Sequence, residues 1–217
     1  PIVFLRTDIY NCITYSDKNK WSDSIINLKW TPEKIKTLLT YRLNIVLNQS
    51  SLSFNQCWYK LCSGIPMRTG ANKKKTINSF EYMLRSTQNR PRDFIKYFQE
   101  CARQVIALDK YRVDQQIIKT ADSEFSEYMR NEIIDEIYAV LPEYEDIFAI
   151  LSLIRKQTFD PQEFVERYDE MVKEGEIPNR GAEKVLKILF DYSVIGNAPS
   201  MKNQSIYKYE KKNARFN

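Results

Sequence analysis

The chain has 217 residues, 43% of them hydrophobic and 28% charged, which is typical of a globular protein and excludes a disordered one. No apolar run approaches the roughly 18 residues of a membrane-spanning helix, and no segment resembles a signal peptide, so we expect no membrane partner. The absence of histidine excludes nucleophilic sites of the Ser-His-Asp and Cys-His types. Five glycines, eight prolines and long helical periodicities predict a mainly α fold.

The net charge of +5 is unevenly divided between the two halves of the chain. Residues 1–112 hold 19 Lys/Arg against 8 Asp/Glu, a net of +11, and residues 113–217 hold 14 against 20, a net of −6. Two interpretations stay open: a polyanion meets the first half, or the two halves attract each other.

Four cysteines offer weak evidence for a metal site. Zinc sites favour Cys/His clusters at short spacing, whereas this chain has no CxxC pair and one CxxxxC pair, Cys57 and Cys62. We therefore expect no metal, and both thiols packed as small apolar groups on a helix. Reduced thiols are typical of a cytoplasmic protein.

The first thirty residues contain two short apolar segments that predict β-strands. Residues 2–5 form a continuous apolar run typical of a buried parallel strand, and Arg6, Thr7 and Asp8 follow at its carboxyl end, where open α/β sheets bind ligands. Residues 25–28 predict a second strand. Two strands make no stable sheet, so we expect the remaining strands upstream and this chain to be a fragment of a longer protein.

Residues 31–112 show helical patterns with clear start signals. Thr31 and Pro32 predict an N-cap with proline at the first helical position, and Ser53 with Gln56 predicts a capping box. Further helices are predicted over about 77–86 and 91–108. The lysine run at 73–75 is interpreted as a solvated loop, with contact to nucleic acid or a neighbouring subunit as the alternative.

The segment Arg90-Pro91-Arg92-Asp93 begins the last of these helices. Proline is tolerated at the first helical position, but a cation in the first turn, such as Arg92, lies against the helix dipole. Two explanations follow: an anion such as a nucleotide phosphate lies nearby, or Arg92 pairs with Asp93 or Glu81.

Residues 111–120 are interpreted as a linker with a short helix, which places a domain boundary there. Helices are then predicted over about 125–141, 143–156, 161–173 and 181–191, with Glu136 among the acids facing solvent on the first. Residues 193–195 and 206–209 predict a β-hairpin. Three helices followed by a two-stranded wing are typical of a winged-helix domain.

In its order of elements, and in Phe4-Leu5-Arg6-Thr7-Asp8 and Arg90-Pro91-Arg92-Asp93, the chain resembles the C-terminal portion of a bacterial AAA+/STAND-type P-loop ATPase. The resemblance implies three parts. Residues 1–30 would be the last strands of the ATPase core, residues 31–112 a helical lid, and residues 113–217 the winged-helix domain.

The same resemblance implies sensor roles for Arg92 and Arg6, with Arg90, Thr7 and Asp8 beside the nucleotide. ATP with Mg²⁺ would be the cofactor of the full-length protein, and the upstream core and further copies of the protein would be its partners. The chain contains no G-x-x-x-x-G-K-[ST] sequence. By itself it is therefore expected neither to bind ATP tightly nor to hydrolyse it.

DNA binding by the winged helix is the alternative function, with no nucleotide role. Residues 113–199 hold 9 Lys/Arg against 19 Asp/Glu, a net of −10 that repels phosphate backbones, so a protein partner or autoinhibition is the favoured role. The candidate nucleic-acid contacts are Lys184, Lys187, Lys202, Lys208, Lys211 and Lys212.

Overall fold

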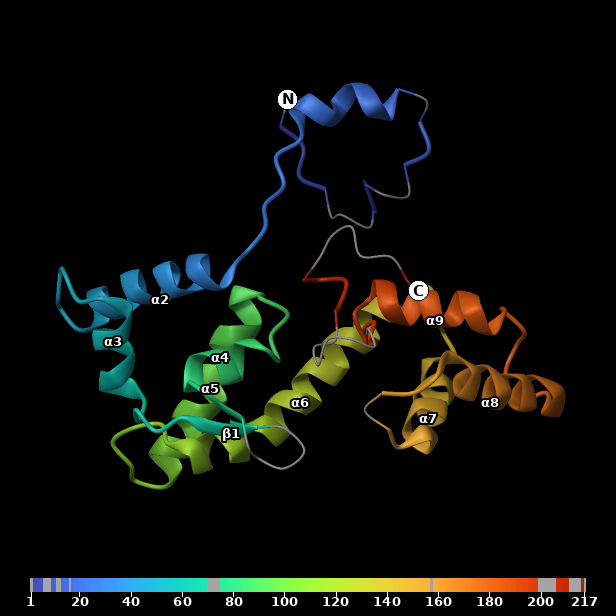
Figure 1. The fold of residues 1–217 in the computed structure, drawn as a ribbon. Coiled ribbons are helices and arrows are strands. Elements are labelled where there is room, and N and C mark those ends of the chain that lie inside the picture. The colour runs from blue at the N-terminus through green and yellow to red at the C-terminus, as the bar shows by residue number, and fades with distance from the viewer. Residues whose placement is uncertain are drawn as a thin grey trace.

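The computed structural model describes residues 2–5, 9–10, 13–15, 17–69, 75–156, 158–198, 206–210 and 216. The prediction of a mainly α fold is confirmed, because helices account for most of these residues (Figure 1). The helices are η1 (Lys18–Ser24, a 3-10 helix), α2 (Pro32–Val46), α3 (Phe54–Leu61), α4 (Ser79–Leu84), α5 (Pro91–Ala107), α6 (Gln115–Ile137), α7 (Tyr144–Ile154), α8 (Pro161–Glu174) and α9 (Ala182–Asp191). Strands β1 (Met67–Thr69) and β2 (Lys75–Ile77) pair in antiparallel fashion, with Arg68 opposite Thr76. None of the described helices is long and apolar enough to cross a membrane.

The predicted helix starts are confirmed where a local cap specified them. The Thr31 side chain accepts a hydrogen bond from Lys34 N, and Ser53 and Gln56 form a reciprocal capping box at the start of α3. Asp160 and Glu163 form a second capping box at the start of α8. Each cap satisfies backbone N–H groups that have no partner inside the helix.

A first hydrophobic core lies among α2, α3, α4, α5 and most of α6. Its centre is aromatic: the Trp58 ring meets Phe80 edge-on at 5.7 Å between centroids and lies 6.1 Å from Phe94. The Trp58 indole N–H donates to the Ser79 hydroxyl at 2.9 Å, so this buried polar group is satisfied. The thiols of Cys57 and Cys62 are buried in α3 and at its C-cap, as predicted.

A second core lies among the end of α6 and helices α7, α8 and α9. It is mainly aliphatic, with Ile147, Ile150 and Leu189 fully buried around the Phe164 and Tyr168 rings. Gly175 ends α8 at φ +76°, in the left-handed conformation that glycine adopts without a steric penalty.

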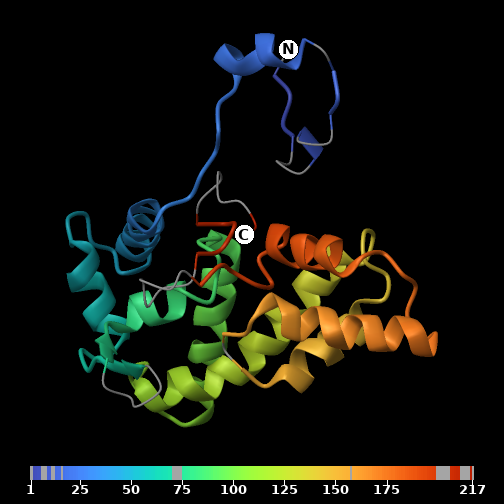
Figure 2. The ribbon, with the colours of Figure 1, turned by 45° about the vertical axis from the view of Figure 1, so that its right-hand side comes forward.

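Helix α6 belongs to both cores. Ile117, Phe125 and Met129 are buried in the first core, and Ile137 is buried in the second. Figure 2 shows α6 extending from one group of helices to the other. The predicted linker at 111–120 is wrong, because Asp114 caps a helix that continues unbroken from Gln115 to Ile137. The buried side chains of α6 are thus divided between the two cores within this one helix.

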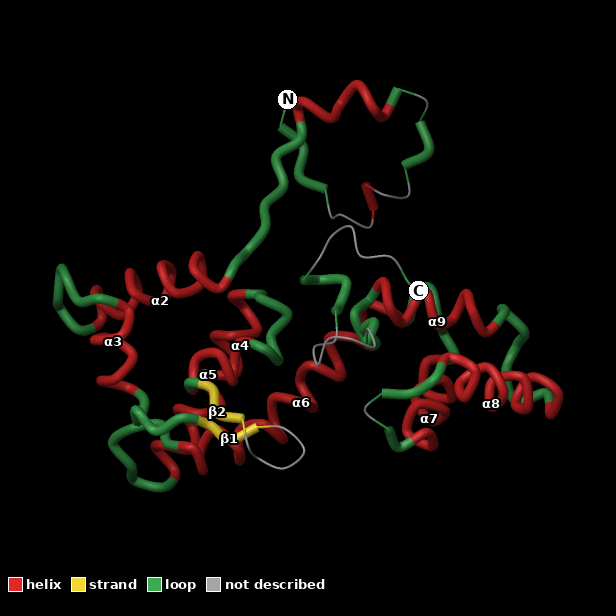
Figure 3. The backbone as a smooth tube through the Cα atoms, viewed as in Figure 1, coloured by secondary structure: helices red, strands yellow, loops and turns green. Residues whose placement is uncertain are grey.

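The two strands predicted in the first thirty residues are wrong for this chain. Residues 2–5 and 25–28 form no strand, and Ile2 and Ile26 are 88% and 86% exposed. Residues 25–31 instead lead as an extended loop to α2 (Figure 3). The physical reason is that strands need a neighbouring strand for their ladder hydrogen bonds, and these segments take part in no β-ladder among the described residues.

The predicted wing is not formed as a hairpin in the part of the chain that the structure describes. The backbone N–H of Ser193 bonds to Phe190 O, and those of Val194 and Ile195 bond to Leu189 O, so this segment closes the end of α9 instead of forming a strand. A single antiparallel bridge joins Asn197 to Ile206.

Candidate functional site

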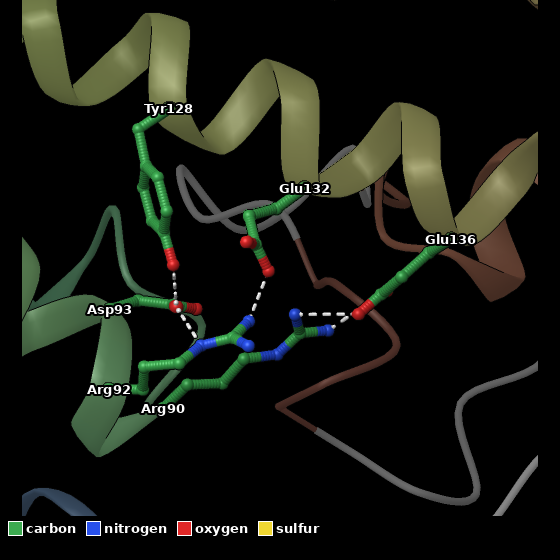
Figure 4. Close-up of polar contacts among 6 residues, drawn as sticks. All are labelled: Arg90, Arg92, Asp93, Tyr128, Glu132 and Glu136. Atoms are coloured by element: carbon green, nitrogen blue, oxygen red, sulfur yellow. Dashed lines mark hydrogen bonds and ion pairs between the residues drawn. The ribbon is translucent and has the colours of Figure 1, made fainter.

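The start of α5 follows the sequence prediction closely. Pro91 occupies the first helical position, and the Arg90 carbonyl accepts the first backbone bond, from Phe94 N at 3.0 Å. Gln88 and Asn89 just before it have φ of 49° and 55°, and the backbone turns sharply there. Arg90, Arg92 and Asp93 then meet side chains of α6 (Figure 4).

Asp93 is the buried centre of this site. Its side chain is fully buried, and Oδ1 accepts hydrogen bonds from the Tyr128 hydroxyl at 3.0 Å and from Arg92 Nε at 3.3 Å. No group among the described residues donates to Oδ2. A negative charge in the first turn is favoured by the helix dipole. Burial, together with the charge of Asp93, raises the pKa of the Tyr128 hydroxyl to about 12.

Two carboxylates of α6 hold the two arginines. Arg90 donates from both terminal nitrogens to the two oxygens of Glu136, at 2.9 and 3.2 Å, and Arg92 forms an ion pair with Glu132. Tyr128, Glu132 and Glu136 are spaced four residues apart, so they lie on one face of α6. The expectation that Glu136 faces solvent is therefore wrong.

The two arginines differ in exposure. The Arg92 side chain is 65% exposed, and that of Arg90 is 36% exposed. Arg92 uses Nε and one terminal nitrogen for Asp93 and Glu132, which leaves much of its guanidinium open to water. The predicted pairing of Arg92 with Asp93 is thus present. Sequence reasoning missed Glu132 because it lies 40 positions away.

A second polar cluster joins α4, α5 and α6 farther along the same interface. Asp122 accepts hydrogen bonds from the Tyr82 hydroxyl at 2.6 Å and from the Tyr97 hydroxyl. Burial raises the pKa of the Asp122 carboxyl. Its two acceptors are taken by neutral hydroxyls, so this cluster stabilises the interface and offers no reactive group.

The remaining predicted site residues lie either on α9 and near the end of the chain or outside the described residues. Arg6, Thr7, Asp8, Lys202, Lys211 and Lys212 lie outside the described residues. Lys184 and Lys187 are exposed on α9 beside the exposed Glu183 and Asp191, and Lys208 lies 3.8 Å from Asp191. Lys184, Lys187 and Lys208 therefore lie among acidic side chains and do not form a continuous cationic surface with one another.

A groove of about 450 Å³ lies where the two cores meet. It is lined mainly by apolar side chains of α6 and α7, including Met129, Ile133, Phe148 and Leu151, with Arg130 beside them. This lining is mainly apolar and supplies packing surface.

The first core is also the part of the chain that resembles a known family. Residues 33–134, just under half of the chain, match the family of FunZ-associated C-terminal helical domains. The match begins in the first turn of α2 and ends near the end of α6, so it includes Arg90, Arg92, Asp93, Tyr128 and Glu132. No curated protein and no solved structure was found to match the chain.

Proposed function

We propose that this chain is the helical lid and C-terminal bundle of a P-loop ATPase, and that Arg92 senses the bound nucleotide. One observation carries the proposal: an exposed arginine at a helix start is held by a carboxylate of α6, the helix shared by both cores. A phosphate that draws Arg92 away would therefore act on the helix that reaches the second core.

The nucleotide and the rest of its site would come from elsewhere in the full-length protein. ATP with Mg²⁺ would bind a P-loop upstream, with Arg6, Thr7 and Asp8 beside it and Arg92 approaching the γ-phosphate. Arg90, bound on both oxygens of Glu136, would fix the start of α5. The match to a C-terminal helical domain family supports a module that works with a separate core.

The exposed apolar segments near the start of the chain also support an upstream partner. Residues 2–5 and 25–28 expose most of the surface of Ile2, Phe4, Ile26 and Leu28. Burying such surface is favourable by about 25 cal/mol per Å². In the proposed protein these apolar side chains pack against the ATPase core.

Helices α7–α9 would face a protein partner or another copy. Their surface is acidic, which opposes binding to a phosphate backbone. Tight duplex binding with a log–log salt slope of several units would instead favour the alternative of a DNA-binding protein with no nucleotide role.

The test is ATP hydrolysis by the full-length gene product, with Arg92→Ala compared with Arg103→Ala. Arg103 is a matched control: it lies on α5, its side chain is 67% exposed, and it pairs with Glu100. We expect Arg92→Ala to lower hydrolysis by more than about tenfold at an unchanged melting temperature, because it removes a transition-state contact. Arg103→Ala should hydrolyse ATP normally. Wild-type turnover in Arg92→Ala would overturn the proposal.

A further inference from the structure

We propose that Glu132 is a built-in competitor for the anion that Arg92 binds, so that the ion pair across α5 and α6 sets the nucleotide affinity of the lid. This inference rests on the proposed nucleotide role of Arg92 and adds the regulation of that site. Glu132 occupies the guanidinium until a phosphate displaces it.

The geometry assigns different tasks to the two arginines. The Arg90 guanidinium bonds both oxygens of Glu136, at 2.9 and 3.2 Å, the bidentate arrangement that gives the strongest arginine–carboxylate pairs. Arg92 meets Glu132 through a single terminal nitrogen, and its side chain is almost twice as exposed as that of Arg90. Arg92 is therefore the arginine that can change partner, while Arg90 keeps the helices together.

Asp93 and Tyr128 keep Arg92 in place during the exchange. Asp93 is fully buried and accepts from both Arg92 Nε and the Tyr128 hydroxyl, so its Oδ1 is fixed. Because the guanidinium is rigid and planar, holding Nε there keeps the terminal nitrogens beside Glu132, where an incoming anion would meet them. Asp93 acts through Arg92 and is a positioning residue.

The negative charge of Glu132 determines whether its removal strengthens or weakens nucleotide binding. A phosphate that approaches Arg92 meets the carboxylate of Glu132 at the same guanidinium, and two anions close together repel each other. Removing the Glu132 charge removes both the competition and the repulsion. A purely structural Glu132 would do the reverse, because its loss would loosen the α5–α6 contact and leave the nucleotide more weakly bound.

The displaced carboxylate also links the site to the second core. Glu132 lies on α6 five positions before Ile137, which is buried in the second core. When Arg92 leaves Glu132, α6 loses one ion pair to α5 about one turn before the helix enters the second core. The Arg90–Glu136 pair persists.

The experiment measures ATP affinity of the full-length protein for Glu132→Gln, with Glu127→Gln as the control. Glu127 is exposed on α6 and has no hydrogen bond or ion pair with Arg92, so its substitution removes the same charge without touching the site. We expect Glu132→Gln to tighten ATP binding by about two- to fivefold, the range that the strength of an exposed ion pair allows. Glu127→Gln should match the wild type.

A double substitution separates this inference from the proposed function. In an Arg92→Ala background, Glu132→Gln should change ATP affinity no further, because the two residues act through one contact. If Arg92→Ala lowers hydrolysis but Glu132→Gln leaves affinity unchanged or weaker, the competitor role is overturned and the sensor role survives. If Arg92→Ala behaves as the wild type, the sensor role itself fails.

Discussion

The two cores of this chain are held together by different kinds of contact. The first combines aromatic rings with carboxylates that accept hydrogen bonds from tyrosine hydroxyls, as in the buried Asp93 with Tyr128 and the half-buried Asp122 with Tyr82. The second is mainly aliphatic. Its polar contacts include a local capping box, Asp160 with Glu163, and a long-range ion pair between Arg180 and Glu143.

The difference lies in how many long-range polar side-chain contacts gather at one interface. In the first core such contacts join α6 to residues of α4, of α5 and of the α5 N-cap that lie 25 to 46 positions away in the sequence. An apolar core is satisfied by any well-packed side chain, whereas a buried carboxylate requires particular donors. The first core therefore specifies one arrangement of α5 on α6, which the proposed sensor role of Arg92 requires.

The largest expected effect tests whether the cores are separate. Phe94→Ala and Phe164→Ala each remove a fully buried ring, and each should cost about 3–5 kcal/mol of unfolding free energy. Phe164 lies in the second core and α5 packs in the first, and α6 contributes buried residues to both. If the cores unfold separately, Phe164→Ala should therefore lower the exchange protection of the α8 amides and leave the α5 amides protected. Hydrogen exchange of the two variants measures this. Loss of protection in both cores from either substitution would show one cooperative unit.

A smaller effect is expected at Asp122. Asp122→Ala leaves the hydroxyls of Tyr82 and Tyr97 without their acceptor, which should cost about 1–3 kcal/mol in a denaturant titration. Asp122→Asn is the control, because its amide oxygen still accepts one of the two hydrogen bonds, and we expect it to lose less. Equal losses would show that the carboxylate charge, and not its acceptor geometry, stabilises the interface.

The smallest effect is a pH dependence at Tyr128. Burial and Asp93 raise the pKa of its hydroxyl to about 12 in the folded chain, so the folded state holds this proton more tightly than the unfolded state. The resulting stability is present below the ordinary value of about 10 and is lost as the pH rises from there towards 12. At neutral pH the Tyr128 hydroxyl is protonated and donates to Asp93. Tyr128→Phe removes this hydrogen bond and should therefore be less stable than the wild type by about 1 kcal/mol at neutral pH.

Denaturant titrations between neutral and alkaline pH test whether the stability that the Tyr128 hydroxyl contributes falls as the pH rises. The stability gap between the wild type and Tyr128→Phe should narrow as the pH rises, while Tyr111→Phe, at a fully exposed position, should show no gap. A gap that stays constant would mean that the Tyr128 hydroxyl is not coupled to Asp93.

The sequence predicts those parts of the fold that local chemistry determines. Thr31 with Pro32, Ser53 with Gln56, and Asp160 with Pro161 mark helix starts within a few residues of the groups that they satisfy. Pro91 likewise marks the start of α5. These signals need no knowledge of the rest of the chain.

The parts that were missed depend on distant partners. Nothing near Arg92 indicates that Glu132 lies beside it, and residues 2–5 have the composition of a strand but no described strand to pair with. Val194 and Ile195 are β-branched and apolar, which predicts a strand, yet their N–H groups bond to the Leu189 carbonyl near the end of α9. Local strand propensity alone did not decide the conformation at residues 2–5 and 193–195.

The most direct test of the account is ATP hydrolysis by the full-length protein with Arg92→Ala, beside the matched Arg103→Ala. Both arginines lie on α5, are about two-thirds exposed and pair with a glutamate, so exposure and charge are controlled. A loss of more than about tenfold for Arg92→Ala alone, at wild-type melting temperature, is the result that a sensor arginine predicts. Equal turnover in the two variants would contradict the account and leave the cluster at the start of α5 as a purely structural clamp.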